Sequence, residues 1–121
     1  IYIGHFSKTA KHGGYAAKAL VEDKGVSVIQ GHTHRFGAHG RTTVDGRVLL
    51  GLENLSMCAR QAAYVSHPNW QLGFAVLYLD RKSGRVQWYP IVIGRHGFVW
   101  KDRLFTTQGT LKVRRVAQRA A

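Results

Sequence analysis

The residues with the clearest capacity for chemistry are two histidines one residue apart, in Gly31-His32-Thr33-His34-Arg35. Neutral imidazole is the commonest nitrogen ligand for borderline divalent metal ions, and a glycine lets the backbone approach an ion closely. If the segment is extended, both imidazoles lie on the same side, since residues i and i+2 share a face. An isolated His-x-His is more often a pair of surface loop histidines. The preceding apolar stretch, Gly31 and Arg35 favour metal binding here.

The elements that must position these histidines form a strand–helix–strand unit. Residues 1–4 have the composition of the end of a buried strand, and His5 follows it. Residues 15–24 are rich in good helix formers and stop at Gly25, which is typical of a C-cap. Residues 26–30 are a short β-branched strand. Such a unit implies parallel strands with ligands at their carboxyl ends, where His5 and the two later histidines fall.

The remainder of the chain has the pattern of antiparallel hairpins. Asp45-Gly46 is a preferred turn between strands at 41–44 and 47–50, and residues 80–84 connect longer strands at 73–79 and 85–93. Pro90 indicates an edge position or a bulge, and residues 97–100 form a further short strand. The pattern fades beyond Thr106. We therefore expect an α/β (α+β) fold over residues 1–105, followed by a basic tail at 106–121.

Composition narrows the classes of partner. The chain has 18 lysines and arginines against 6 acids, a net charge of +12, which predicts attraction to polyanions such as nucleic acid. Part of this charge lies at 112–119 and is also what an ordinary solvated end would carry. No apolar run is long enough to cross a membrane and no signal peptide is evident, so we expect no membrane partner. The single Cys58 fits a reducing compartment, and we expect a cytoplasmic location.

Several of these segments together resemble the calcineurin-like metallophosphoesterases, in particular those common in phage and prophage genomes. The resemblance covers roughly residues 1–95. It is carried by four features, namely His5, Lys11-His12-x-Gly14-Tyr15-x-Ala17, Gly31-His32-Thr33-His34-Arg35 and Asn69-Trp70-Gln71-x-Gly73-Phe74. It implies that this chain is the C-terminal half of a two-sheet sandwich, a βαβ unit followed by antiparallel hairpins.

The resemblance also implies an activity, which is hydrolysis of phosphoesters at a centre of two divalent ions (Mn, Fe, Zn or Ni). In that family His5 and His32 would ligate one ion and His34 the other. With Arg35 they are our catalytic candidates. Nucleic acid is among the candidate substrates, and the choice between a phosphatase and a phosphodiesterase or nuclease stays open.

The chain departs from the family pattern in what it lacks. The family's Asp-x-His, Gly-Asp and Asn-His ligands have no counterpart here, and Phe6 stands where the related pattern has a small residue. The chain begins at Ile1, inside an apolar run, so we expect a fragment or an incomplete gene product. Such a chain would be inactive alone and would need the N-terminal half or an oligomeric partner.

Other polar residues are weaker candidates. Arg35 and Lys11 could clamp phosphate oxygens, with His12 in a similar position, although for Lys11 and His12 a solvated loop role is as plausible. His39 and His67 lie in expected loops, while His96 and Asn54 fit turns. Cys58 fits a small buried residue better than a nucleophile, and five aromatic side chains fit sheet packing better than base stacking: Trp70, Phe74, Trp88, Tyr89 and Trp100.

Two other accounts of the chain stay open. It could be a basic nucleic-acid-binding module without catalysis, for which the charge of +12 is the evidence. It could also be a truncated, non-functional remnant, whose uncovered apolar sheet edge would favour aggregation or pairing with another chain.

Overall fold

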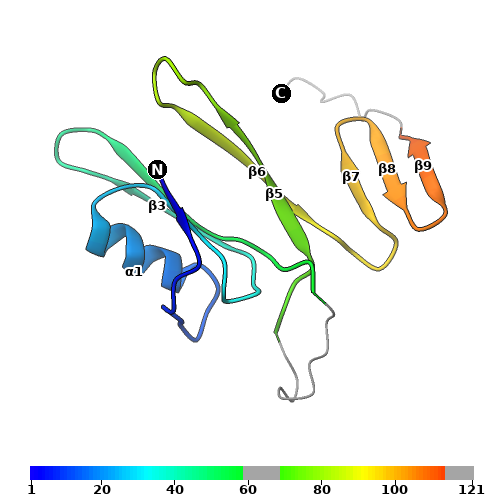
Figure 1. Ribbon diagram of the computed structural model, residues 1–121, viewed down its shortest axis with the longest axis horizontal. Coiled ribbons are helices and arrows are strands. Elements are labelled where there is room, and N and C mark those ends of the chain that lie inside the picture. The colour runs from blue at the N-terminus through cyan, green and yellow to red at the C-terminus, as the bar shows by residue number, and fades with distance from the viewer. Residues whose placement is uncertain (59–68, 114–121) are drawn as a thin grey trace, which may run out of the picture.

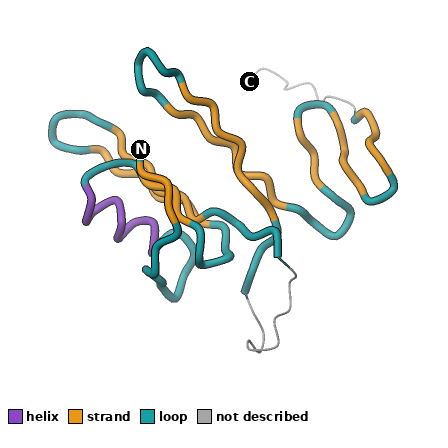
Figure 2. Tube along the Cα trace, in the orientation of Figure 1, coloured by secondary structure: helices purple, strands orange, loops and turns teal. Residues whose placement is uncertain are grey.

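The computed structural model describes residues 1–58 and 69–113. In these ranges the protein is a mixed α+β structure with one helix and several small sheets (Figure 1). Strands dominate, and loops connect their ends (Figure 2). No helix in the described part of the chain has the length and apolar character needed to span a bilayer.

A four-stranded sheet forms the N-terminal part, in the order β1 (Tyr2–Gly4), β2 (Val28–Gln30), β4 (Val48–Glu53) and β3 (Gly37–Thr42). β1 and β4 pair parallel to β2, whereas β3 pairs antiparallel to β4. The predicted βαβ unit and the hairpin across Asp45-Gly46 are confirmed. The hairpin strands are longer than expected, and the parallel pairing of β4 with β2 was not foreseen.

The predicted helix is confirmed as α1 (Tyr15–Lys24), which packs on one face of this sheet. Its buried stripe meets Val28 and Leu49 in the main core. Gly51 of β4 is needed for this packing, because a Cβ there would lie 2.9 Å from the carbonyl oxygen of Ala17. Gly25 ends the helix in the left-handed region at φ 62°, as the sequence predicts.

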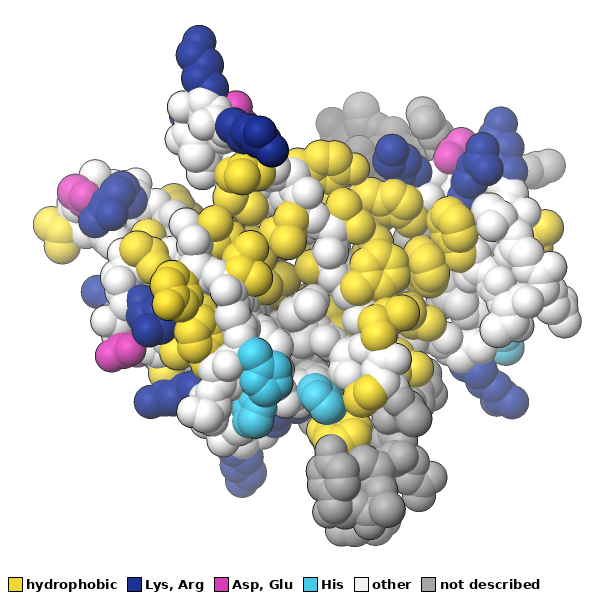
Figure 3. Space-filling view, viewed as in Figure 1, with side chains coloured by type: hydrophobic (Ala, Val, Ile, Leu, Met, Phe, Trp, Pro, Cys, Tyr) yellow, Lys and Arg dark blue, Asp and Glu magenta, His cyan; other side chains and the backbone are white. Residues whose placement is uncertain are grey.

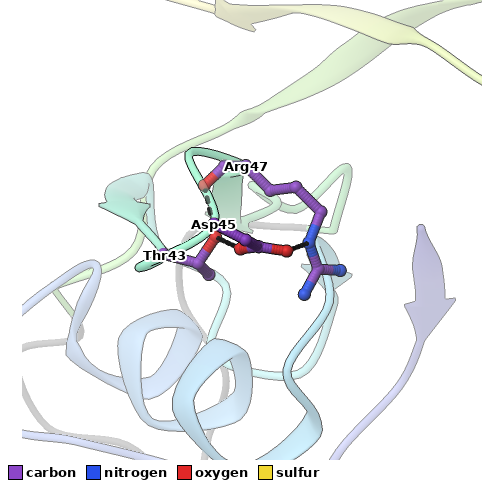
Figure 4. A network of polar contacts seen from close by, with 3 residues as sticks. All are labelled: Thr43, Asp45 and Arg47. Carbon is purple, nitrogen blue, oxygen red and sulfur yellow. Dashed lines mark hydrogen bonds and ion pairs between the residues drawn. The ribbon is translucent and has the colours of Figure 1, made fainter.

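Three polar side chains fix the turn between β3 and β4 (Figure 4). The hydroxyl of Thr43 donates to the carboxylate of Asp45, and Arg47 Nε lies 2.7 Å from Asp45 Oδ2. These two interactions, led by the Thr43 hydrogen bond, hold the pKa of Asp45 below its usual value. The turn is therefore closed by side chains as well as by the positive φ of Gly46.

The C-terminal part consists of two antiparallel units. β5 (Gly73–Leu79) and β6 (Val86–Val92) form the predicted long hairpin. β7 (Phe98–Trp100), β8 (Arg103–Thr106) and β9 (Gly109–Lys112) form a three-stranded meander. β8 and β9 were not predicted, so a regular strand exists inside the segment that we expected to be a tail. Residues 114–121 of that segment lie outside the described ranges.

Leu55, which follows β4, packs against the start of the hairpin. Leu52, Leu55 and Ile91 are buried, and Leu55 lies so close to Gly73 that a Cβ there would be 2.6 Å from Leu55 Cδ2. By contrast, β1 is an edge strand with Tyr2 and Ile3 more than half exposed. The core is thus concentrated between α1, β2 and β4, and apolar surface remains at β1 and along the hairpin.

Candidate metal centre

His5 and His32 are brought together as the sequence predicts. His5 follows β1 and the Gly31–His32 turn follows β2, and the two strand ends are joined by a hydrogen bond from Gly31 N to Gly4 O of 3.0 Å. The two imidazole centroids lie 4.8 Å apart, nearly edge to face. Both side chains are exposed. Imidazole is a common ligand of borderline divalent ions, so these two neighbouring rings are candidates for part of a coordination shell.

The turn that carries His32 and His34 has an unusual backbone. His32 has φ 88° and His34 has φ 55°, a region that non-glycine residues seldom adopt and that is enriched at functional sites. We predicted from strand alternation that both imidazoles lie on the same side, which assumes an extended segment. The segment is not extended, so the premise of that prediction is wrong. Gly31 is not sterically required by its neighbours, since a Cβ there would only touch His5 Cδ2 at 3.5 Å.

His34 has surroundings different from those of the His5–His32 pair. Its ring lies 4.6 Å from that of Trp70, and its Nδ1 is 3.6 Å from the thiol of Cys58. Its carbonyl oxygen accepts a hydrogen bond from Gln71 N. Cys58 is exposed, contrary to our expectation of a small buried residue. Histidine side chains gather on one face of the molecule (Figure 3), but across residues 1–58 and 69–113 no three His, Cys, Asp or Glu residues form a group able to hold a metal ion.

Arg35 acts on the loop that precedes α1. Its guanidinium donates to the carbonyl oxygens of Ala10 and Lys11, at 2.5 and 2.9 Å. A planar fork that binds two successive carbonyls fixes a loop firmly. Arg35 therefore holds the basic residues of this loop, including Lys11 and His12, next to the histidine turn, which gives it a structural task in addition to the phosphate clamp expected from the sequence.

A buried polar cluster lies at the same carboxyl edge, and the sequence reasoning missed it. Glu53 and Gln30 are fully buried and occupy paired positions on β4 and β2. Glu53 Oε1 accepts hydrogen bonds from Ala16 N (3.0 Å) and Ala17 N (3.4 Å), so it caps α1 from another strand. The sequence carries one signal for this cluster, namely an acidic residue at the end of an otherwise apolar strand.

Part of this polar cluster is left without a hydrogen bond. The atoms concerned have no partner among the described residues and belong to four side chains that follow or end β2 and β4: Gln30 Nε2 and Oε1, Thr33 Oγ1, Glu53 Oε2 and Asn54 Oδ1. Unpaired buried polar atoms are rare in complete folds and point to missing waters, ions or protein groups. The carboxyl edge is therefore the place where the described residues leave buried polar atoms available to other groups.

The weaker candidates are spread over the molecule. His12 stacks edge-on against Tyr15 at 5.5 Å, at the start of α1. His39 is half-buried on β3 opposite Gly51, and His96 lies in the exposed turn 94–97. Asn54 donates its backbone N–H to Gln30 O at 2.7 Å. His67 lies outside the described residues.

Comparison with known proteins finds relatives in bacteriophages. The chain is 41% identical over 87 residues to the gene 54 protein of Mycobacterium phage L5, and 40% identical over 87 residues to the gene 54 protein of Mycobacterium phage D29. Each alignment covers 64% of this chain and 34% of the relative. No family model and no solved structure matches. The chain thus matches about a third of the length of these phage proteins, whose names state no activity.

Proposed function

We propose that this chain carries the C-terminal metal-ligand part of a calcineurin-like phosphoesterase, which hydrolyses phosphoesters with two divalent ions. His5 and His32 would bind one ion and His34 the other. The observation that carries the proposal is the 4.8 Å separation of the His5 and His32 rings at neighbouring parallel strand ends. The separate surroundings of His34 agree with a role at a second ion.

The described residues fit such a centre only in part. They offer imidazoles but no carboxylate grouped with them, so we propose that further polypeptide supplies the remaining ligands. The phage relatives are about three times longer than the aligned stretch, which leaves room for such ligands. Bound divalent ions would activate water and stabilise charge on the reacting phosphoester.

The same additional polypeptide, or an oligomeric partner, would complete the two-sheet sandwich. β1 has an open edge with exposed Tyr2 and Ile3, and parallel strands are usually covered on both faces. In the isolated chain we expect little hydrolysis. A reducing, cytoplasmic setting suits the free thiol of Cys58 beside His34.

The residues of this chain would bind and orient. His5 and His32 would hold an ion at the strand ends, while Arg35 keeps the Lys11 loop close to the histidine turn through two carbonyl hydrogen bonds. Lys11 and His12 would then offer cationic or hydrogen-bonding contact to phosphate oxygens. Glu53 anchors the other end of this loop by capping α1.

The proposal is tested in a polypeptide of the relatives' length that contains this chain. With Mn²⁺ and a chromogenic phosphodiester, His32→Ala and His5→Ala should each lower kcat/KM by about 100-fold or more, since even outer-shell changes cost ~10–100-fold. His96→Ala removes an exposed histidine of the 94–97 turn and serves as the control. The metal content measured after dialysis should fall in the first two variants. Unchanged activity and metal content in His32→Ala would overturn the assignment.

A second candidate function is nucleic-acid binding without catalysis. The charge of +12 favours it, and binding that is steeply salt-dependent but indifferent to chelator would support it. It does not exclude the first function, because a nuclease also gains from a basic surface.

A further inference from the structure

A row of aromatic rings crosses three strands of the C-terminal part. Tyr78 of β5 lies 5.8 Å from Tyr89 of β6, and Tyr89 lies 5.7 Å from Trp100 of β7, measured between ring centroids. Tyr78 is 50% and Tyr89 is 44% exposed. We name these three residues the aromatic stripe. Large rings packed in series are normally core, so their exposure calls for an explanation.

According to the strand register, two cations lie next in line after Trp100. Trp100 pairs with Arg103 of β8, and Arg103 pairs with Lys112 of β9. Both cations are exposed, and none of the ion pairs found in the described ranges involves either of them. Like charges directly opposite each other on neighbouring strands are destabilising. An anion bound beside them would relieve this repulsion.

A second row of rings supports the first. Phe74 and Phe98 lie on the same side of β5 and β7 as the stripe, and Phe105 of β8 pairs with Phe98; the centroid separations are 5.4 Å for Phe74–Phe98 and 5.0 Å for Phe98–Phe105. This row fastens the meander to the hairpin. Phe98 and Phe105 also line a cavity of about 780 Å³, together with Arg95 and His96, so a further cation lies next to the aromatic surface.

Figure 3 shows how these side chains are distributed on the surface. Hydrophobic side chains gather over the region of β5, β6 and β7, and Lys and Arg side chains lie around the outer part of the meander. On this face a hydrophobic area and a basic area therefore adjoin each other. In the segment 94–113 there are four lysines and arginines, namely Arg95, Lys101, Arg103 and Lys112, against the single acid Asp102.

We propose that the aromatic stripe and the Arg103–Lys112 pair bind single-stranded nucleic acid. Unpaired bases stack on Tyr78, Tyr89 and Trp100, and the phosphates contact the two cations, which is the combination that sequence-tolerant single-strand binders use. Bases within a duplex are stacked on one another and do not offer free faces to exposed rings. The binding needs no metal, so it stands or falls separately from the phosphoesterase proposal.

The site is tested with residues 1–121 and a fluorescein-labelled oligothymidine of about 12 nucleotides, within the ~4–16 nucleotides that single-strand-binding folds cover. Anisotropy is measured in EDTA at several salt concentrations. Arg103→Glu/Lys112→Glu should weaken binding by about tenfold or more and reduce the slope of log K against log salt by about 1.4, the value for two lost contacts to a single strand. Tyr89→Ala should weaken binding by about fivefold or more.

The control for charge is Lys18→Glu/Arg41→Glu, which makes the same change in net charge at exposed positions on α1 and β3. It should retain most of the affinity. If the two double variants lose affinity equally, or if the unmodified chain binds no oligothymidine at low salt, the proposal is wrong. Tighter binding to a duplex than to a single strand of equal length would also overturn it.

Tryptophan fluorescence gives a second, local readout. Trp100 belongs to the stripe. Trp88 pairs with Leu77, and both directly neighbour the stripe residues Tyr89 and Tyr78 along their strands, so Trp88 lies on the opposite side of the hairpin. Oligothymidine should quench the fluorescence of the Trp88→Phe variant and should quench that of Trp100→Phe much less. Equal quenching in both variants would show that the nucleic acid binds elsewhere. A stable dimer in which Trp100 is shielded from a neutral quencher would show that polypeptide covers the stripe instead.

Discussion

Replacing Glu53 by alanine should remove the cap of α1 and lower the free energy of unfolding. Glu53 is fully buried, and its Oε1 accepts hydrogen bonds from Ala16 N at 3.0 Å and Ala17 N at 3.4 Å. Gly14, which precedes the helix, offers no side-chain cap. The first-turn amides therefore depend on a carboxylate from β4, and its removal leaves them buried without an acceptor.

The expected loss in the free energy of unfolding is set mainly by the shorter of these two hydrogen bonds. A hydrogen bond to a charged group contributes about 1.5–3 kcal/mol, and the longer contact contributes less. Removing a carboxylate from the interior recovers part of its desolvation cost. We expect a net loss of about 2 kcal/mol. With an unfolding entropy of about 2.1 cal/mol/K per residue, a chain of this length then melts about 8 °C lower.

The assay is thermal unfolding followed by far-ultraviolet circular dichroism. The matched control is Glu22→Ala, the same substitution on the exposed face of α1, where the carboxylate lies 3.9 Å from Lys18 Nζ with both side chains about half exposed. It should cost less than about 0.5 kcal/mol. Glu53→Gln keeps an acceptor oxygen and should recover more than half of the loss. Equal melting temperatures for Glu53→Ala and Glu22→Ala would refute the capping role.

Three further predictions concern a close backbone contact, the loop held by Arg35 and the turn between β3 and β4. Gly37→Ala should destabilise the fold by about 3 kcal/mol or more in urea unfolding, because a Cβ would lie 1.9 Å from Gly14 N. The control Gly40→Ala should be tolerated, because its Cβ meets only Leu50 Cδ2 at 3.7 Å. Arg35→Lys cannot bridge two carbonyls, so it should cost about 1 kcal/mol and speed amide hydrogen exchange in residues 8–13; unchanged exchange would count against the loop-holding role. Asp45 has a pKa lowered by Thr43 and then Arg47, so its contribution to stability is present above its ordinary value of 3.8 and is lost as pH falls through the lowered value. The stability difference between the unmodified chain and Asp45→Asn should therefore shrink in acid, and a difference constant from pH 7 to about pH 2 would contradict this.

Local signals predicted most of the elements. The run of helix formers at 15–24 with Gly25 after it gave α1 with the bounds that the structure has, because propensity and the C-cap act within a few residues. The Asp45-Gly46 dipeptide and the 80–84 turn gave both hairpins for the same reason. The short strands β8 and β9 lack alternation strong enough to be recognised, and they depend on their pairing with β7.

The sequence predicted one part of the candidate site and missed another. The adjacency of His5 and His32 follows from two parallel strand ends, so topology alone was enough to expect it. The relation of His34 to this pair could not be derived, because it depends on the positive φ values of the turn and on contacts with Trp70 and Cys58. Whether these histidines act on a phosphoester stays a prediction.

By itself the sequence determined the helix, the hairpins, the excess of positive charge and the presence of histidines at two strand ends, since each of these depends on composition or on neighbours along the chain. Only the tertiary structure decided that β4 lies between β2 and β3, that its Glu53 caps a helix 36–37 residues away in sequence, and that three aromatic rings from β5, β6 and β7 line up with two cations. These features depend on pairings between distant segments, whose free energy comes from burial and register and is not encoded in any short stretch of residues.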